Sequence, residues 1–375
     1  MQKPIIRKII IQVIGDEKAL RPKWAEFLDD MYSTTTICKI FCQNHLSGLS
    51  GATTYAPGQF DFSVLHAVKN IAKQLIGQEA LYTEKLYGLM NKSVTQNKLT
   101  GISLLDIALW DLKAKAVSLP LYILLGGARD KIPVYASSPL LNDSQAYIEY
   151  IKQCAKLGFK AIKIHGYSIF KKDWQLIKTI NKELNKTNIS LILDTEGQYT
   201  REQALRMAKL LEQNQNWIWL EAPLDDEDLV GYKYLRTNTQ IPIYCSGNQF
   251  LSLESINRGI QSQAWSGLRA DATIVGGITK IQKIAALAQA NHLKLEIQSW
   301  GTQLTQAANL HCMLSNNQCS YFELPFPSEP YQIACKQCFS IDEKGMIKTE
   351  EKPGLGVELD HNKIKQNLLK ELIIQ

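Results

Sequence analysis

Three oxygen-bearing side chains recur along this chain at one fixed interval. Asp194, Glu221 and Asn248 follow one another at intervals of 27 residues, and each comes after a short run of residues typical of a buried strand. Taken singly, such a residue is typical of a helix cap or a turn. Two carboxylates and an amide oxygen at matched strand ends instead form the hard oxygen-ligand set that suits Mg2+. The spacing therefore predicts a metal site.

Two further polar groups stand one strand earlier. Lys163 and His165 are two residues apart in a strand-like run, so their side chains face the same way. The simplest interpretation is a surface lysine beside a core histidine. Inside a barrel, however, a lysine is rarely buried without a partner, and an imidazole exchanges a proton near neutral pH. We expect this pair to reach a ligand held by the metal.

A regular alternation of strands and helices must position these groups. Eight strand-like runs separated by helical segments occupy roughly 200 residues, which is typical of a (β/α)8 barrel, with a doubly wound sheet as the alternative. The runs are 132–135, 161–164, 190–193, 217–220, 242–244, 267–269, 293–297 and 320–322. Barrel active sites lie at the carboxyl ends of the strands. The polar groups at those ends are Ser137 and Ser138, Lys163 and His165, Asp194, Glu221, Asn248, Asp271, Gln298 and Glu323.

The first third of the chain has a different, α+β texture. Strands are predicted over 4–13 and 34–43, and apolar residues at helical spacing predict helices over 62–76 and 104–117. Between the second strand and the first helix, residues 46–58 contain glycine and serine, and we interpret them as a mobile loop.

Composition and charge exclude several classes of protein. The 375 residues are 45% hydrophobic and 21% charged, which is typical of a globular protein and not of a disordered one. The net charge of +6 is modest and spread out, so we expect no nucleic-acid partner. No run approaches the roughly 18 apolar residues of a membrane span. The eight scattered cysteines indicate reduced thiols, and hence a cytoplasmic protein.

Several longer motifs carry a family resemblance. They are Asp106-Ile-Ala-Leu-Trp-Asp-Leu-Lys113, Leu119-Pro-Leu-Tyr122 with Leu125-Gly-Gly127, Leu193-Asp-Thr-Glu-Gly-Gln-Tyr-Thr200, Trp219-Leu-Glu-Ala-Pro223, Val275-Gly-Gly-Ile-Thr279 and Pro353-Gly-Leu-Gly-Val357. Over essentially its whole length, the chain resembles the mandelate racemase/muconate lactonizing enzyme group of the enolase superfamily. The resemblance implies an α/β fold with a modified TIM barrel, (β/α)7β, over residues 129–339. An α+β capping domain over 1–128 would be completed by the C-terminal tail, 340–375.

The resemblance also implies a shared first chemical step. Mg2+ and a cationic side chain hold a substrate carboxylate, and a base removes the proton α to it, which gives an enediolate stabilised by the metal. Asp194 and Glu221 match the first two metal ligands, and Asn248 matches a third that is usually acidic. Lys163 matches the lysine that contacts the carboxylate, and His165 replaces a second lysine that acts as the base.

The opposite face of the site departs from the family pattern. Asp271 matches the aspartate of an Asp-His dyad, but the histidine position holds Gln298, which cannot take a proton and which we expect to bind substrate. Glu323 matches a carboxyl that, when protonated, donates to the developing enolate. Glu196 stands where asparagine is common, and is either a supporting group or an acid catalyst. Two further residues, Ser138 and Trp300, are expected to line the substrate pocket.

These departures select among the reactions of the group. Racemisation needs a base on each face, and only His165 is present. The muconate branch carries a lysine just before its Gly-Gly turn, where this chain has Ile274 and Val275. Dehydration needs a single base, so the sequence favours a dehydratase of an acid sugar, such as an aldonate or aldarate. The alternatives are a racemase, epimerase or cycloisomerase of the same superfamily, and a barrel that only binds an acid ligand.

Two further expectations follow from the resemblance. Substrate specificity should depend on cap segments near 46–58 and 22–31. The partner is expected to be a small carboxylate substrate, a sugar acid, in a homo-oligomer that is a dimer or an octamer.

Overall fold

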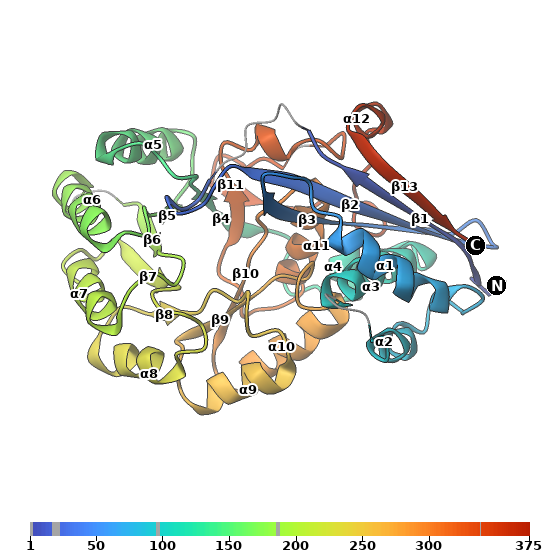
Figure 1. Ribbon diagram of the computed structural model, residues 1–375, viewed down its shortest axis with the longest axis horizontal. Helices are drawn as coiled ribbons and strands as arrows, with labels where there is room; N and C mark the ends of the chain where they lie inside the picture. Colours follow the sequence, from blue (N-terminus) through green and yellow to red (C-terminus); the bar gives the residue numbers. More distant parts are fainter. Residues whose placement is uncertain (1–2, 17–22, 95–97, 185–187, 338) are drawn as a thin grey trace.

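The computed structural model describes residues 3–16, 23–94, 98–184, 188–337 and 339–375. Its N-terminal part is an antiparallel sheet in the order β13-β1-β2-β3, covered by helices (Figure 1). The elements of this part are β1 (Ile6–Ile14), β2 (Met31–Cys42), β3 (Ser47–Pro57), α1 (Ser63–Ala72), η1 (Lys73–Leu75), α2 (Thr83–Asn91), α3 (Lys98–Ala116) and α4 (Leu121–Leu124). The last strand of the sheet, β13 (Leu368–Ile374), comes from the far end of the chain.

Helix α3 connects this sheet to the rest of the molecule. Its residues from Gly101 to Leu112 are buried on all sides, as expected of a helix with protein on every face. On the barrel side, Trp110 Nε1 donates to Thr279 Oγ1 at 2.8 Å. The Asp106 carboxylate accepts bonds from the backbone N and hydroxyl of the same threonine, at 2.9 and 2.6 Å. The motif that begins at Asp106 therefore joins the two parts.

The larger part is a parallel sheet whose strands alternate with helices. Its order is β10-β9-β8-β7-β6-β5-β4-β11, so β11, the last parallel strand, lies beside β4, the first. The strands are β4 (Ile132–Ser137), β5 (Ala161–His165), β6 (Ser190–Asp194), β7 (Trp217–Glu221), β8 (Ile243–Tyr244), β9 (Gly267–Ala270), β10 (Lys294–Ile297) and β11 (Phe322–Pro325). The helices between them are α5 (Ser144–Lys156), α6 (Phe170–Leu184), α7 (Arg201–Leu211), α8 (Leu229–Asn238), α9 (Leu253–Gln261), α10 (Ile278–Ala290) and α11 (Gln303–Leu314).

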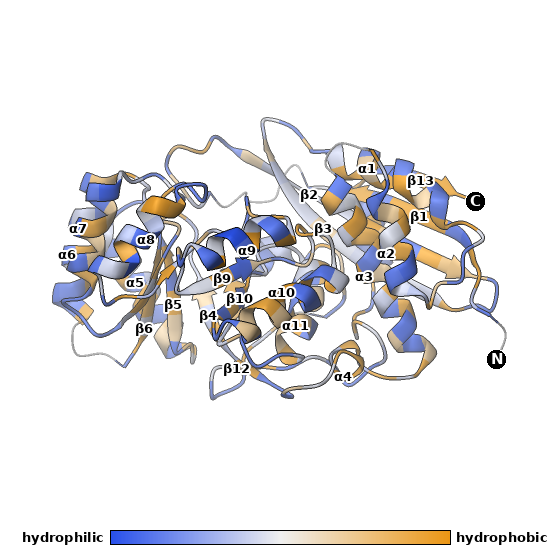
Figure 2. Ribbon diagram, turned by 90° about the horizontal axis from the view of Figure 1, so that it is seen from below, coloured by the Kyte–Doolittle hydropathy of each residue, from blue (hydrophilic) through white to orange (hydrophobic). Residues whose placement is uncertain are grey.

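This arrangement confirms the predicted modified TIM barrel with an α+β N-terminal domain. The outer helices carry both hydrophilic and hydrophobic stretches (Figure 2), as expected where each buries one face. Within the described residues, no strand ladder joins β10 to β11. The buried Glu296 bridges this seam, because its carboxylate accepts bonds from the backbone N of Ser320 and Tyr321, at 3.0 and 3.3 Å.

The segment 46–58 is a strand, β3, so its prediction as a mobile loop was wrong. It pairs with β2 along its whole length, from Phe41↔Ser47 to Met31↔Pro57. Its glycines are needed for close packing against helices. A Cβ at Gly48 would overlap the backbone O of Ala108 in α3, and a Cβ at Gly51 would overlap the side chain of Leu304 in α11.

The segment after the barrel contacts both parts of the molecule. Its elements are η2 (Glu329–Tyr331), β12 (Met346–Ile347), α12 (His361–Gln366) and β13. Strand β12 pairs with β4 of the barrel, whereas β13 pairs with β1.

Two observations bear on the composition. The seven cysteines in the described residues are free and buried, and Cys338 lies outside those residues. Among the helices in the described ranges, none combines the length and apolar character needed to span a bilayer.

Candidate active site at the barrel mouth

A cavity of about 450 Å³ lies at the carboxyl ends of the barrel strands, with walls from both parts of the chain. The barrel contributes Lys163, His165, Asp194, Glu196, Glu221, Ser246, Asn248, Asp271, Ile274, Gln298, Trp300 and Glu323. The N-terminal part contributes Trp24, Met31, Thr53, Thr54, Tyr55, Asp61 and Thr100. A buried layer of Tyr135, Trp219 and Tyr244 fills the barrel interior, so the cavity has a packed floor.

Lys163 lies at the centre of a cluster of carboxylates. Its Nζ is 3.1 Å from Asp194 Oδ2, 3.1 Å from Glu221 Oε1 and 2.8 Å from Glu323 Oε1. Asp194 and Glu221 are register partners on β6 and β7, which explains why residues 27 apart meet. Burial favours a neutral lysine, but the carboxylates outweigh it and raise the pKa of Lys163 well above its ordinary value. Lys163 is therefore a buried cation.

Arg269 is a second buried cation, which the sequence prediction did not include. Its Nη2 lies 2.8 Å from Glu221 Oε1 and 3.3 Å from Glu323 Oε2, and its Nη1 donates to the Tyr135 hydroxyl at 3.1 Å. The available signal was an arginine inside a short barrel strand, because a charge in a barrel interior needs partners.

Glu323 is the acidic group that both cations share. Burial alone would raise the pKa of Glu323, but Lys163 and Arg269 hold it well below its usual range. The Ser137 hydroxyl also donates to this carboxylate, at 2.9 Å. In this arrangement Glu323 is ionised, whereas the role implied by the resemblance needs its protonated form.

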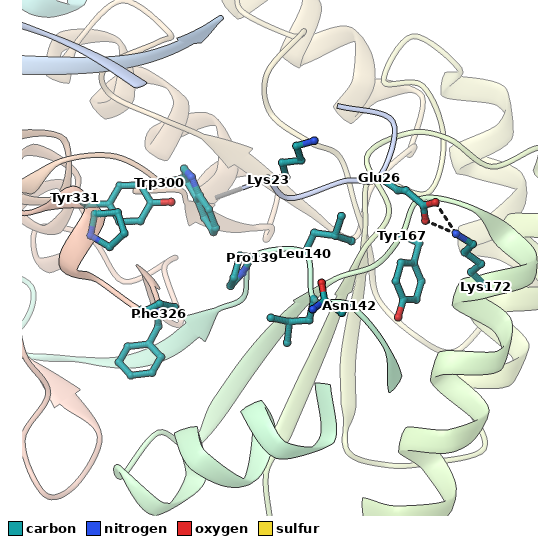
Figure 3. Close-up of a pocket in the computed structure, with 13 residues that line it drawn as sticks. Lys23, Glu26, Pro139, Leu140, Asn142, Tyr167, Lys172, Trp300, Phe326 and Tyr331 are labelled. Atoms are coloured by element: carbon teal, nitrogen blue, oxygen red, sulfur yellow. Dashed lines mark hydrogen bonds and ion pairs between the residues drawn. The ribbon is translucent and has the colours of Figure 1, made fainter. Parts of the chain in front are cut away.

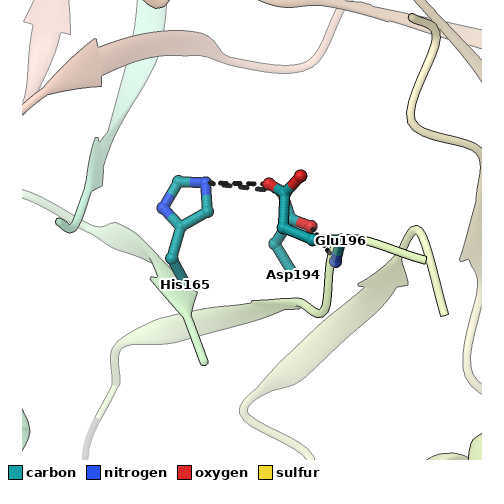
Figure 4. Close-up of side chains that lie close together, drawn as sticks. All are labelled: His165, Asp194 and Glu196. Carbon is teal, nitrogen blue, oxygen red and sulfur yellow. Dashed lines mark hydrogen bonds and ion pairs between the residues drawn. The ribbon is translucent and has the colours of Figure 1, made fainter. Parts of the chain in front are cut away.

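His165 is held in one tautomer with a free nitrogen in the cavity. Its Nδ1 lies 2.6 Å from the carbonyl oxygen of Ser138, which can only accept, so Nδ1 carries the proton. Its Nε2 is 3.5 Å from Asp194 Oδ2 and 4.0 Å from Glu196 Oε1 (Figure 4). Burial and the charge of Lys163 lower the pKa of His165 to about 3. The imidazole is therefore neutral, with an unprotonated Nε2.

Glu196 lies directly beside the first predicted metal ligand. Its backbone has a positive φ of 53°, and its N–H donates to Asp194 Oδ1 at 3.2 Å. Burial and the negative charge of Asp194 raise the pKa of Glu196. His165, Asp194 and Glu196 each offer a ligand atom within 4.8 Å of the others, so this trio could also hold a metal ion.

Asn248 and Gln298 form a pair at the more exposed side of the cavity. Gln298 Nε2 donates to Asn248 Oδ1 at 2.9 Å and to the carbonyl of Ser246 at 3.1 Å. Asn248 is exposed, in contrast to the buried Asp194 and Glu221. The amide oxygen predicted as a metal ligand is therefore occupied by another side chain in this structure.

Asp271 is directed toward its own loop and a neighbouring helix. Its Oδ1 accepts bonds from the backbone N and hydroxyl of Thr273, both at 2.7 Å, and from Asn309 of α11 at 2.8 Å. Burial raises the pKa of Asp271 to about 6. In the family dyad, a histidine would be the partner of this carboxyl. Here Thr273 and Asn309 hold the carboxyl in place instead.

Comparison with known proteins identifies the family. A family model for the mandelate racemase/muconate lactonizing enzyme N-terminal domain matches residues 9–126, and one described as enolase C-terminal domain-like matches residues 146–363. The chain belongs to the enolase superfamily, in its mandelate racemase/muconate lactonizing enzyme group. The resemblance carried by the sequence motifs is thus confirmed.

Individual relatives of this superfamily member span most or all of its length. A solved structure from Pseudovibrio sp. with only the family-level name is 36% identical, covers 100% of both chains and has a TM-score of 0.97. The 3,6-anhydro-D-galactonate cycloisomerase from Zobellia galactanivorans is 27% identical, covers 98% of this chain and 100% of its own, and has a TM-score of 0.84. A D-mannonate dehydratase of Caulobacter vibrioides is 27% identical over 86% of this chain and 89% of its own.

Asp173 of α6 connects the loop that follows His165 with the loop that carries Glu196. Its carboxylate accepts bonds from Tyr167 N at 2.6 Å and from the Tyr199 hydroxyl at 2.8 Å. Burial raises the pKa of Asp173 from 3.8 to about 6. The folded state therefore binds this proton more tightly than the unfolded state.

This binding predicts a pH-dependent stability difference. The proton on Asp173 stabilises the fold most fully below about pH 4, and this contribution is lost as the pH rises through about 6. Asp173→Asn cannot lose a proton, so it should gain stability relative to the parent between about pH 4 and pH 7, by on the order of 3 kcal/mol. Urea unfolding of both proteins at several pH values measures this. A difference that stays constant with pH would contradict the prediction.

Proposed function

We propose that this superfamily member is a Mg2+-dependent dehydratase of a sugar acid. The observation that carries the proposal is the single neutral imidazole of His165, whose Nε2 faces the cavity while its Nδ1 is bound to Ser138. On the other side of the same cavity, the position of a second base holds Gln298, which cannot accept a proton at neutral pH. One base is sufficient for elimination and insufficient for two-base racemisation.

The charge balance of the cavity favours a divalent cation. Six acidic side chains line it: Asp61, Asp194, Glu196, Glu221, Asp271 and Glu323. Two buried cations, Lys163 and Arg269, pair with only three of them, Asp194, Glu221 and Glu323. The pKa of Glu221 is raised by burial and by Asp194 and Glu323, although Arg269 and Lys163 oppose the shift. A cluster of this kind is stabilised by added positive charge, and oxygen ligands favour Mg2+.

Asp194 and Glu221 are the side chains that we propose as metal ligands, with the Asn248 oxygen as a third. When bound, the ion would supply Lewis-acid stabilisation of negative charge on the substrate carboxylate. Lys163, which pairs with these carboxylates here, would provide a cation for the same substrate group. Gln298 would release Asn248 and hydrogen-bond the substrate.

The remaining steps use the chain's own groups. His165 Nε2 takes the α-proton, and the electrons of the C–H bond pass into the enediolate. The imidazolium then protonates the β-hydroxyl, which leaves as water, and the resulting enol tautomerises to a 2-keto acid. Because the Nδ1 hydrogen bond is kept throughout, the ring stays oriented for both proton transfers.

A second candidate is cycloisomerisation or another isomerisation of a sugar acid. It is favoured by the similarity to a cycloisomerase over 98% of this chain, whereas the similarity to a dehydratase supports the main proposal. Both reactions begin with removal of the same α-proton. They differ in the later step, because water leaves only in the dehydration. A third possibility, binding of an acid without turnover, is motivated by Asn248 and Gln298.

The test is incubation with Mg2+ and a panel of aldonates and aldarates in D2O, followed by proton NMR. Formation of a 2-keto acid supports dehydration. Exchange of the α-proton without a 2-keto product favours an isomerisation. Binding without exchange at any pH would leave only an acid-binding barrel. Removal of divalent ions with EDTA should stop exchange, and added Mg2+ should restore it.

A further inference from the structure

A second cavity, of about 560 Å³, lies next to the catalytic one. We call it the side cavity; it is lined by the loop after β4, the loop after β11 and residues of the cap segment 23–26 (Figure 3). Trp300 lines both cavities. The volume of the side cavity falls within the range of roughly 300–1,000 Å³ that small-molecule sites occupy. The mechanism proposed above does not use this space.

The cap segment 23–26 covers both cavities and is fixed to the barrel. The carbonyl of Lys23 accepts a bond from Leu140 N at 2.7 Å, and Glu26 N donates to the carbonyl of Tyr167 at 3.3 Å. The Glu26 carboxylate pairs with Lys172 of α6 at 2.5 and 2.7 Å (Figure 3). Trp24, in the same segment, lines the catalytic cavity. The same cap segment therefore borders both cavities.

The wall between the two cavities contains buried polar atoms without a hydrogen bond of normal geometry. The Trp300 ring lies 5.1 Å from the His165 ring on one side and 5.8 Å from the Tyr331 ring on the other. Among the described residues, Trp300 Nε1 and the Tyr331 hydroxyl make no hydrogen bond within the usual limits of distance and angle, although Tyr331 is only 3% exposed. The two groups interact only weakly with each other. Figure 3 shows the Tyr331 hydroxyl directed toward Trp300. Buried polar groups are normally satisfied, so a ligand hydroxyl at this wall would stabilise both.

The lining of the side cavity suits a sugar ring. Pro139, Phe326 and Tyr331 provide flat apolar faces, whereas Asn142 and Lys172 provide polar groups. A pyranose has the matching character, because its C–H faces are apolar and its hydroxyl edges are polar. An aliphatic chain would leave the buried Tyr331 hydroxyl without a ligand partner, whereas Lys172 is already paired with Glu26 and Asn142 is exposed.

We propose that the substrate is a glycosylated sugar acid, with its carboxylate end in the catalytic cavity and its glycosyl ring in the side cavity. This inference rests on the proposed function, because it assumes a sugar acid at Lys163 and His165. It specifies a substrate class, a glycosyl aldonate, that is larger than a free aldonate or aldarate.

Calorimetric binding in Mg2+ tests the proposal, with gluconate compared with its 4-O-glycosyl derivatives maltobionate, cellobionate and lactobionate. At least one derivative should bind about tenfold more tightly than gluconate, because remote contacts add binding energy. Leu140→Trp, which fills the side cavity, should remove this preference and leave gluconate binding unchanged. Leu157→Trp, at an exposed position after α5, is the matched control and should keep the preference.

Two outcomes would overturn the proposal: glycosylated acids that bind no better than gluconate, or a preference that Leu140→Trp leaves intact. Exchange of the α-proton in D2O, measured on the same samples, separates this inference from the proposed function. A binding preference without exchange would refute the dehydratase and keep the side cavity as a sugar subsite. Exchange on gluconate with formation of a 2-keto acid, but without any binding preference, would keep the dehydratase and refute the sugar subsite.

Discussion

Replacing His165 with asparagine should lower the rate of α-proton exchange by about 10²–10⁴-fold, the range that a positioned general base contributes. The amide that His165→Asn introduces can still donate to the carbonyl of Ser138, the partner of His165 Nδ1, so we expect the fold to persist. The substitution removes only the basic nitrogen that faces the cavity. Exchange in D2O, followed by proton NMR on an acid that the parent protein turns over, measures the effect.

The control for this experiment is the same substitution at another histidine. His292 is exposed and has a positive φ of 54°, a conformation that asparagine tolerates. His292→Asn should therefore exchange at the parental rate. Full exchange by His165→Asn would show that another group is the base, and the dehydratase proposal would lose the observation that carries it.

Replacing Arg269 with leucine should destabilise the fold by about 3–5 kcal/mol, the cost of breaking a buried ion pair by removing one partner. Arg269 is buried and pairs with both Glu221 and Glu323. Without it, these carboxylates share only Lys163, and Tyr135 loses a hydrogen-bond donor. The free energy of unfolding in urea, measured without added metal, gives the magnitude directly.

An exposed arginine provides the comparison for this variant. Arg258 on α9 is exposed, so Arg258→Leu should change stability by no more than about 0.5 kcal/mol. Arg269→Lys keeps the charge but lacks the forked donors, and should fall between the parent and Arg269→Leu. A loss below about 1 kcal/mol for Arg269→Leu, well under the usual cost of breaking a buried pair, would mean that Lys163 alone balances the two glutamates.

The barrel could be predicted because its information is local and periodic. Each strand is a short apolar run, and each of the first seven is followed by its helix, so the polar residue at each strand end could be placed from chain order alone. Strand register then brings Asp194 opposite Glu221 and His165 opposite Asp194. For the same reason Lys163 meets the carboxylates that the spacing suggested.

Features that depend on distant contacts could not be predicted in this way. Segment 46–58 looked like a loop because two of its glycines, Gly48 and Gly51, are explained only by α3 and α11, which pack against them. The bond between Asn248 and Gln298 joins loops 50 residues apart, and local sequence has no signal for it. Arg269 was missed because the prediction from the run 267–269 used the polar residue that follows it, Asp271, and not a charge within the strand itself.

The pairing of β1 with β13 has a consequence for how the protein is made. These strands are register partners, as in Ile9↔Ile374, yet almost the whole chain separates them. During translation, residues 129–339 leave the ribosome while β1 still has one open edge. An unpaired edge invites pairing with other chains, and synthesis at about 5–20 residues per second leaves it open for many seconds. We expect nascent chains to need protection at this edge, and the N-terminal sheet to be completed only after residues 368–374 emerge.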